Sequence, residues 1–221
     1  MMNNKKFFLI LLVIFLLLPT AVKAERQLNG DDLEVQQSEE GQTFVATGDV
    51  ELIYDELRIT AEDEGIYRRF NGEVEFRNNV EFFYQQYEGQ AVELTGNLDQ
   101  EIINLIDQAQ VRGPEAYIEA DRIDIYQAEE RIEVEGDAYL EYNDFWAEAD
   151  QIVYYLDREF IHLKGNVKGE RNGERFSADE AEINQKTEEV HLQGKARLTL
   201  PAEEESEENT EEPVEAEADD N

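Results

Sequence analysis

Apolar and polar residues alternate along most of this chain with a period of two. From Ile132 to Tyr142 every second residue is apolar or small, and most of the residues between them are acidic. This pattern is typical of a β-strand with one buried face and one face in water. The same phase recurs in residues 44–54, 74–84 and 190–200. The sequence therefore predicts an all-β fold.

A column of glycine, asparagine or aspartate recurs in the middle of these segments every 29 or 30 residues. Its members are Gly48, Asn78, Asp107, Gly136, Gly165 and Gly194. A fixed period of this size indicates one supersecondary unit repeated along the chain. A second column of small residues lies between the members of the first: Ala61, Gly89, Ala120, Ala149 and Ala178.

Turn signals such as Asn143–Asp144 and Asn172–Gly173 lie about midway between the columns and predict hairpins. Antiparallel pairing then brings both columns onto one line across the sheet. Around the second column the alternation slips by one residue, which predicts a β-bulge in those strands. We predict a creased antiparallel sheet, a β-taco or elongated jelly roll, of about 11 to 12 long bent strands, with a strand around 33–35 as the twelfth. The crease residues are Gly48, Ala61, Ala120, Gly136, Ala149, Gly165, Ala178 and Gly194.

The inward positions mix Val, Ala, Gly and Leu without a regular large residue. An underfilled interior would admit acyl chains, at about 0.8 kcal/mol per buried methylene. The alternative is that the columns only shape the core of an inert solenoid. The candidate groove residues are Val50, Leu52, Val80, Phe82, Ile123, Ile125, Val134, Leu140, Ile152, Leu163, Val167, Leu192 and Leu198.

Both ends of the chain differ from the repeats. Lys5 and Lys6 precede an apolar run over 7–18, and small or branched residues follow up to Ala24. This predicts a secretory signal peptide over 1–24 that is cleaved near Ala24. A retained anchor is the alternative, although the run is shorter than the roughly 20 residues of a spanning helix. We divide the rest into a lead-in over 25–41, a repeat domain over 42–200 and a disordered acidic tail over 201–221.

The net charge is −35, and residues 25–200 alone hold 43 acidic against 16 basic residues. Nucleic acid is bound by basic surfaces, so this composition argues against it as a partner. An acidic, solvated surface adapted to a salty medium explains the charge, because salt screens self-repulsion.

The sequence offers little for catalysis or for metal binding. It has no cysteine, and its two histidines, His162 and His191, occupy the same repeat position 29 residues apart and point outward by parity. We interpret them as duplicated surface residues. Nearly all acidic residues fall at outward positions, and no nucleophile or nucleotide motif is present, so we predict no enzyme, no metal and no cofactor. Trp146 is expected in the core.

Several segments resemble the OstA-like repeats of the LptA family. They include ATGDVEL at 46–52, YIEADRIDIY at 117–126 and AEADQIVYYLD at 147–157, with the pattern G-[DN]-V followed by A-D-x-I-x-Y. The resemblance covers about 42–200, and it departs from the pattern where Asn78 and Asp107 replace glycine.

This resemblance implies a periplasmic lipopolysaccharide-transport protein that holds the acyl chains of the lipid A moiety inside a jelly roll. It also implies stacking end to end, and edge-strand contacts with LptC-like inner-membrane and LptD-like outer-membrane proteins. We expect the two edges at 44–54 and 190–200, where strand addition joins proteins. The alternatives are a membrane-anchored LptC-like adaptor and a structural periplasmic β-filament without lipid binding.

Overall fold

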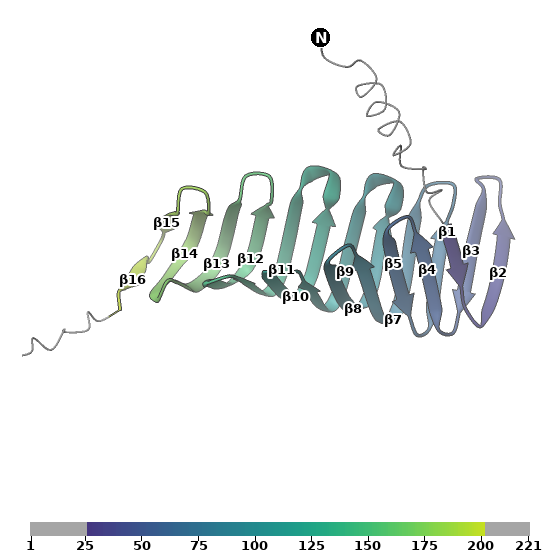
Figure 1. Ribbon diagram of the computed structural model, residues 1–221, viewed down its shortest axis with the longest axis horizontal. Coiled ribbons are helices and arrows are strands. Elements are labelled where there is room, and N and C mark those ends of the chain that lie inside the picture. Colours follow the sequence, from purple (N-terminus) through teal and green to yellow (C-terminus); the bar gives the residue numbers. More distant parts are fainter. Residues whose placement is uncertain (1–25, 202–221) are drawn as a thin grey trace, which may run out of the picture.

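The computed structural model describes residues 26–201, so the predicted signal peptide and nearly all of the acidic tail lie outside it. These residues form one antiparallel sheet of 16 strands, drawn in Figure 1, with two 3-10 turns and no α-helix in the described part. The strands are β1 (Arg26–Asn29), β2 (Asp32–Gln37), β3 (Gln42–Thr47), β4 (Val50–Tyr54), β5 (Leu57–Ala61), β6 (Glu64–Arg68), β7 (Glu73–Tyr84), β8 (Tyr87–Asn97), β9 (Ile102–Arg112), β10 (Ala116–Tyr126), β11 (Arg131–Tyr142), β12 (Phe145–Tyr155), β13 (Phe160–Arg171), β14 (Glu174–Asn184), β15 (Glu189–Gln193) and β16 (Arg197–Thr199). The turns are η1 (Leu98–Gln100) and η2 (Gln127–Glu129).

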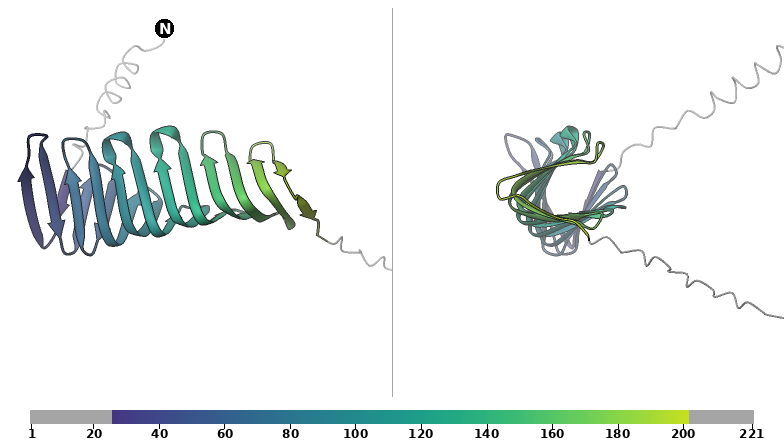
Figure 2. Two further views of the ribbon diagram at one scale, coloured as in Figure 1. Left: turned by 180° about the vertical axis from the view of Figure 1, so that it is seen from behind. Right: turned by 90° about the vertical axis from the view of Figure 1, so that its left-hand side faces the viewer.

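The 16 strands correspond to twelve bent strands that follow one another along the sheet. Strands β7 to β14 run through the crease without a break, whereas four others are split there into β1 and β2, β3 and β4, β5 and β6, and β15 and β16. The predicted creased sheet of 11 to 12 bent strands is therefore confirmed. The end-on panel of Figure 2 shows the strands curving into a trough.

The crease separates two walls that face each other. The first wall holds β2, β3, β6, β15 and the adjoining halves of β7 to β14, and the second wall holds β1, β4, β5, β16 and the other halves. Each long strand thus contributes to both walls, so the hydrophobic core lies between them. Its largest fully buried side chains include Phe76, Leu94, Leu105, Ile152 and Leu163.

Each member of the first column begins a pair of consecutive residues with positive φ. In β11 the pair is Gly136 (φ 78°) and Asp137 (φ 45°). Glu135 pairs with Gln151 and Ala138 with Ala149, so two residues of β11 face one residue of β12. This is a β-bulge, and it turns the strand from one wall into the other. The same geometry recurs at Gly48–Asp49, Asn78–Asn79, Asp107–Gln108, Gly165–Asn166 and Gly194–Lys195.

The prediction that the bulges lie in the second-column strands is wrong. The bulged residues belong to the first column, and the alternation slips beside Ala149 because β12 crosses the same corner with one residue fewer. Gly89 was also misassigned, because Ala91, 13 residues after Asn78, occupies the second-column position opposite Val80. Gly89 instead lies under the ring of Phe82, which a Cβ there would meet.

A neighbouring aspartate explains why glycine recurs at the bulge. A Cβ on Gly136, Gly165 or Gly194 would meet the carboxylate of an aspartate 15 residues earlier, on the preceding strand. Those aspartates are Asp121, Asp150 and Asp179. Where the column holds Asn78 and Asp107 instead, the residue types are the two that enter the left-handed region most readily after glycine.

Replacing a crease glycine should therefore cost more than replacing a turn glycine of the same φ. Gly165 (φ 76°) faces Asp150, whereas no atom lies within 4 Å of the position that a Cβ on Gly173 (φ 81°) would take. We expect Gly173→Ala to lower the free energy of unfolding by about 1 kcal/mol, from backbone strain alone. We expect Gly165→Ala to cost about 2–3 kcal/mol, because the carboxylate must also move. Urea unfolding of both variants measures the difference, and equal losses would contradict the role given to Asp150.

Candidate functional site

All thirteen candidate groove residues face the space between the walls, but most of them fill it. Ten are no more than 3% exposed, packed between the walls. The interior near the crease is thus occupied by the protein's own side chains. Among the candidates, only Phe82 and Ile125 line open space. Leu192 and Leu198 lie at the C-terminal end, where Leu198 is 56% exposed.

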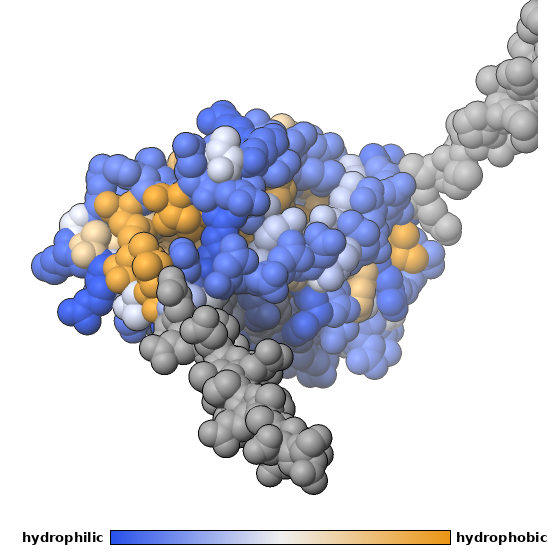
Figure 3. Space-filling view, turned by 60° about the vertical axis from the view of Figure 1, so that its left-hand side comes forward, coloured by the Kyte–Doolittle hydropathy of each residue, from blue (hydrophilic) through white to orange (hydrophobic). Residues whose placement is uncertain are grey.

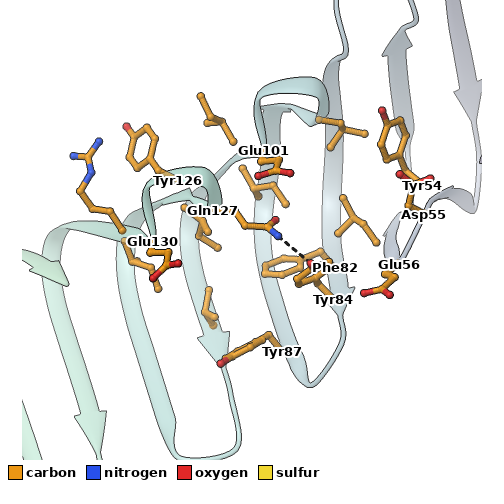
Figure 4. A pocket seen from close by; sticks show the side chains of 18 of the residues that line it. Tyr54, Asp55, Glu56, Phe82, Tyr84, Tyr87, Glu101, Tyr126, Gln127 and Glu130 are labelled. Carbon is orange, nitrogen blue, oxygen red and sulfur yellow. Dashed lines mark hydrogen bonds between the residues drawn. The ribbon is translucent and has the colours of Figure 1, made fainter. Parts of the chain in front are cut away.

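The open space is a cavity of about 930 Å³ at the mouth of the trough, between the free margins of the walls. Figure 4 shows most of its lining side chains, which come from strands and connections between β4 and the turn after β12. The apolar part of the lining includes Leu57, Phe82, Leu98, Ile103, Val111, Ile125 and Ile132. The polar part includes Asp55, Glu56, Glu101, Glu130 and Arg131. An apolar floor beneath a charged rim is suited to an amphiphile, with its chains below and its polar group in water.

Sequence reasoning missed most of this lining. The alternation could have identified Ile103, Val111 and Ile132, since each shares the inward phase of its strand. Leu98 gives no such signal, because it begins the 3-10 turn η1, outside the period of two.

Tyrosines are concentrated along the mouth. Six of the ten in the sequence project between the walls near their free margins: Tyr54, Tyr67, Tyr84, Tyr87, Tyr142 and Tyr154. The Tyr54 hydroxyl donates to Asp99 Oδ1 at 2.9 Å, and the Tyr84 hydroxyl accepts from Gln127 Nε2 at 2.9 Å. A tyrosine combines an apolar ring with a polar tip, which suits the boundary between the apolar floor and water.

Burial raises the pKa of three of these phenols, those of Tyr54, Tyr67 and Tyr154. It raises the pKa of Tyr54 to about 12, assisted by the hydrogen bond to Asp99, and it raises the pKa of Tyr154 to about 12. Both side chains are neutral hydrogen-bond donors at any physiological pH.

Both ends of the trough expose inward-facing apolar residues. Leu33 and Val35 on β2 are 53% and 52% exposed, and Leu198 and Leu200 at the other end are 56% and 63% exposed. Figure 3 shows the hydrophobic patch at the C-terminal end, surrounded by hydrophilic surface. These side chains are exposed because, within residues 26–201, no further strand continues the walls.

The N-terminal edge differs from the prediction. Residues 44–54 lie in β3 and β4, and both strands are covered, because β2 pairs with β3 and β1 pairs with β4. The edge is instead formed by β1 and β2, within the segment that we expected to be a lead-in. The C-terminal edge is formed by β15 and β16, within the predicted range 190–200 and one residue before it.

The remaining chemical candidates lie on the outer face. His162 Nε2 is 2.5 Å from Glu180 Oε1, while Glu182 separates His162 from His191 across the strands. Within residues 26–201, no group of three or more potential metal ligands comes together.

Trp146 was expected in the core, but it stands on the outer face between Glu141 and Glu170, because its neighbours Phe145 and Ala147 point inward. Among the described residues, no helix is long and apolar enough to span a membrane.

Comparison with known proteins agrees with this architecture. A family model described as LptA/(LptD N-terminal domain) LPS transport protein matches residues 20–131 and 115–189. The chain belongs to this family. The predicted membership in the LptA family is thereby confirmed.

A solved structure shows the same fold. The chain is similar to LptH from Pseudomonas aeruginosa, described as the LptA-homologous periplasmic component of the lipopolysaccharide transport device. The TM-score is 0.50 and the sequence identity 14%, and the match covers 53% of this chain and 96% of LptH. No curated protein matches the chain.

The raised tyrosine pKa values predict a loss of stability at high pH. The folded chain holds the Tyr54 and Tyr154 protons more tightly than the unfolded chain does. The stabilisation that results is present below pH 10, the ordinary pKa of tyrosine, and is lost as the pH rises towards 12. Urea unfolding between pH 10 and pH 12 measures how steeply the free energy of unfolding falls with pH. Tyr154→Phe should make the slope shallower, and a variant as sensitive to pH as the natural chain would refute the assignment.

Proposed function

We propose that this protein is a periplasmic carrier that binds the acyl chains of lipopolysaccharide between its two walls and conducts the lipid from the inner to the outer membrane. The observation that supports it best is the continuous inward apolar surface, which runs the length of the sheet, opens into the mouth cavity and is exposed at both ends. Residues 1–24 would be removed near Ala24 on export, and the chain itself would catalyse no reaction.

The acidic rim indicates which part of the lipid supplies the affinity. Asp55, Glu56, Glu101 and Glu130 line the cavity together with Arg131, so the rim does not attract anionic phosphates. The acyl chains must therefore provide most of the binding free energy through apolar burial. The phosphorylated head group would stay in the solvent above the rim, where salt screens its repulsion.

Assembly would use the two edges. Strand addition of β1 and β2 to β15 and β16 of a second copy would join two troughs and cover the exposed Leu33, Val35 and Leu198. The same edges would meet LptC-like and LptD-like partners at the two ends of an array.

Photocrosslinking at neighbouring positions of β11 tests lipid binding. Ile132 lines the cavity, whereas Glu133, the next residue, faces outward. A photoreactive residue at 132 should capture lipopolysaccharide from its own envelope, and the same group at 133 should capture at most a tenth as much. Equal capture at the two positions, or none at 132 or at any other inward position, would contradict binding inside the groove.

A charge at the exposed N-terminal end tests assembly. We expect Val35→Glu to abolish concentration-dependent self-association in sedimentation, because the carboxylate would be buried against the next copy. Gln36→Glu is the matched control, since it adds the same charge to the opposite face of β2. If both variants associate like the natural chain, the inner surface of β2 is not part of the junction.

A further inference from the structure

Side-chain hydrogen bonds connect the two walls across the mouth, two of them at the cavity and one nearer the C-terminal end, where Arg171 Nη1 donates to the Glu188 carbonyl at 3.1 Å. Tyr54 at the end of β4 belongs to the second wall, and its partner Asp99 lies in η1 at the margin of the first wall. Tyr84 at the end of β7 belongs to the second wall, and its partner Gln127 lies in η2. The partners are 45 and 43 residues apart in sequence, so these are contacts between opposing walls and not within a hairpin.

The turns η1 and η2 are neighbours on the margin of the first wall and are hydrogen-bonded to each other. They are the only 3-10 turns in residues 26–201, each followed by a left-handed glutamate, Glu101 or Glu130. The backbone N–H of Gln127 donates to the Glu101 carbonyl at 3.0 Å, which ties η2 to η1, and the backbone N–H of Leu156 donates to the Glu130 carbonyl at 2.8 Å. Figure 1 shows the two turns as neighbouring connections at the upper margin of the sheet. A movement of one turn would therefore carry the other with it.

The contacts lie over the cavity. Tyr54, Tyr84 and Gln127 all line it, and Leu98 of η1, which is 8% exposed, lines it as well. Figure 4 shows the Tyr84–Gln127 hydrogen bond within this lining. A lipid that enters between the walls must break these hydrogen bonds, which are partly or fully exposed and therefore individually weak. The freed phenols can then hydrogen-bond to the polar linkage between acyl chains and head group.

We propose that Tyr54–Asp99 and Tyr84–Gln127 form a latch across the mouth, and that lipid enters and leaves the cavity sideways when this latch opens. The inference rests on the proposed lipid binding. It adds a route through the mouth to the route through the ends of the trough.

The absence of cysteine from the natural chain allows a direct test. In the double variant Tyr84→Cys, Gln127→Cys, a short bis-maleimide with a disulfide in its spacer ties the walls together, and a reductant releases them. The matched control is Gln90→Cys, Gln110→Cys, a pair whose side chains hydrogen-bond at 2.7 Å on the outer face of the second wall. The measurement is the initial rate at which each protein takes up purified fluorescent lipopolysaccharide.

We expect the tied mouth variant to load at least tenfold more slowly than the same variant after reduction, and the tied control to load like the natural chain. As a second variant that needs no linker, Tyr54→Phe with Tyr84→Phe removes only two hydroxyls and should load several-fold faster than the natural chain. Equal loading by tied and reduced mouth variants would overturn the latch and indicate entry through the ends. If the natural chain binds no lipopolysaccharide, the proposed function fails first, and the latch with it.

Discussion

The fold depends on one contact: an aspartate carboxylate beside a pair of left-handed residues on the next strand. At Gly136, Gly165 and Gly194 the glycine leaves room for the carboxylate, and the positive φ of both residues turns the strand from one wall into the other. Because the pair of left-handed residues recurs on alternate strands, all corners lie on one line and the walls remain in register. Without that alignment, the inward faces of the two walls would not meet in a single core.

Much of this architecture could be predicted from the sequence, because one face of each strand is buried. The alternation from Ile132 to Tyr142 predicts which side chains point inward, and the 29-residue period predicts where the strands bend. The side of the corner that carries the extra residue could not be predicted, since a bulge in β11 and one in β12 give the same slip of phase beside Ala149. The N-terminal edge was missed because β1 and β2 hold only Leu28, Leu33 and Val35 as apolar positions among polar residues.

The cavity was predicted at the wrong depth for a related reason. Alternation gives the direction of a side chain but not how far the opposite wall stands from it. Near the crease the walls converge, and Val134 and Leu140 pack against their neighbours with 1% exposure each. Towards the margins the walls diverge, so open space appears beside Phe82 and Ile125. Such a gradient depends on the angle of the crease, which no local sequence pattern encodes.

The way the crease is built makes the length of the trough adjustable in fixed increments. Each pair of bent strands is an almost self-contained module of 29 or 30 residues with its own bulge, and neighbouring strands lie about 4.8 Å apart. Twelve bent strands therefore extend the trough to roughly 50 Å, and a tandem duplication would lengthen it by about 10 Å without disturbing either wall. Nearly all of LptH aligns with about half of this chain. A gain or loss of modules would therefore change the reach of the trough in steps of two strands.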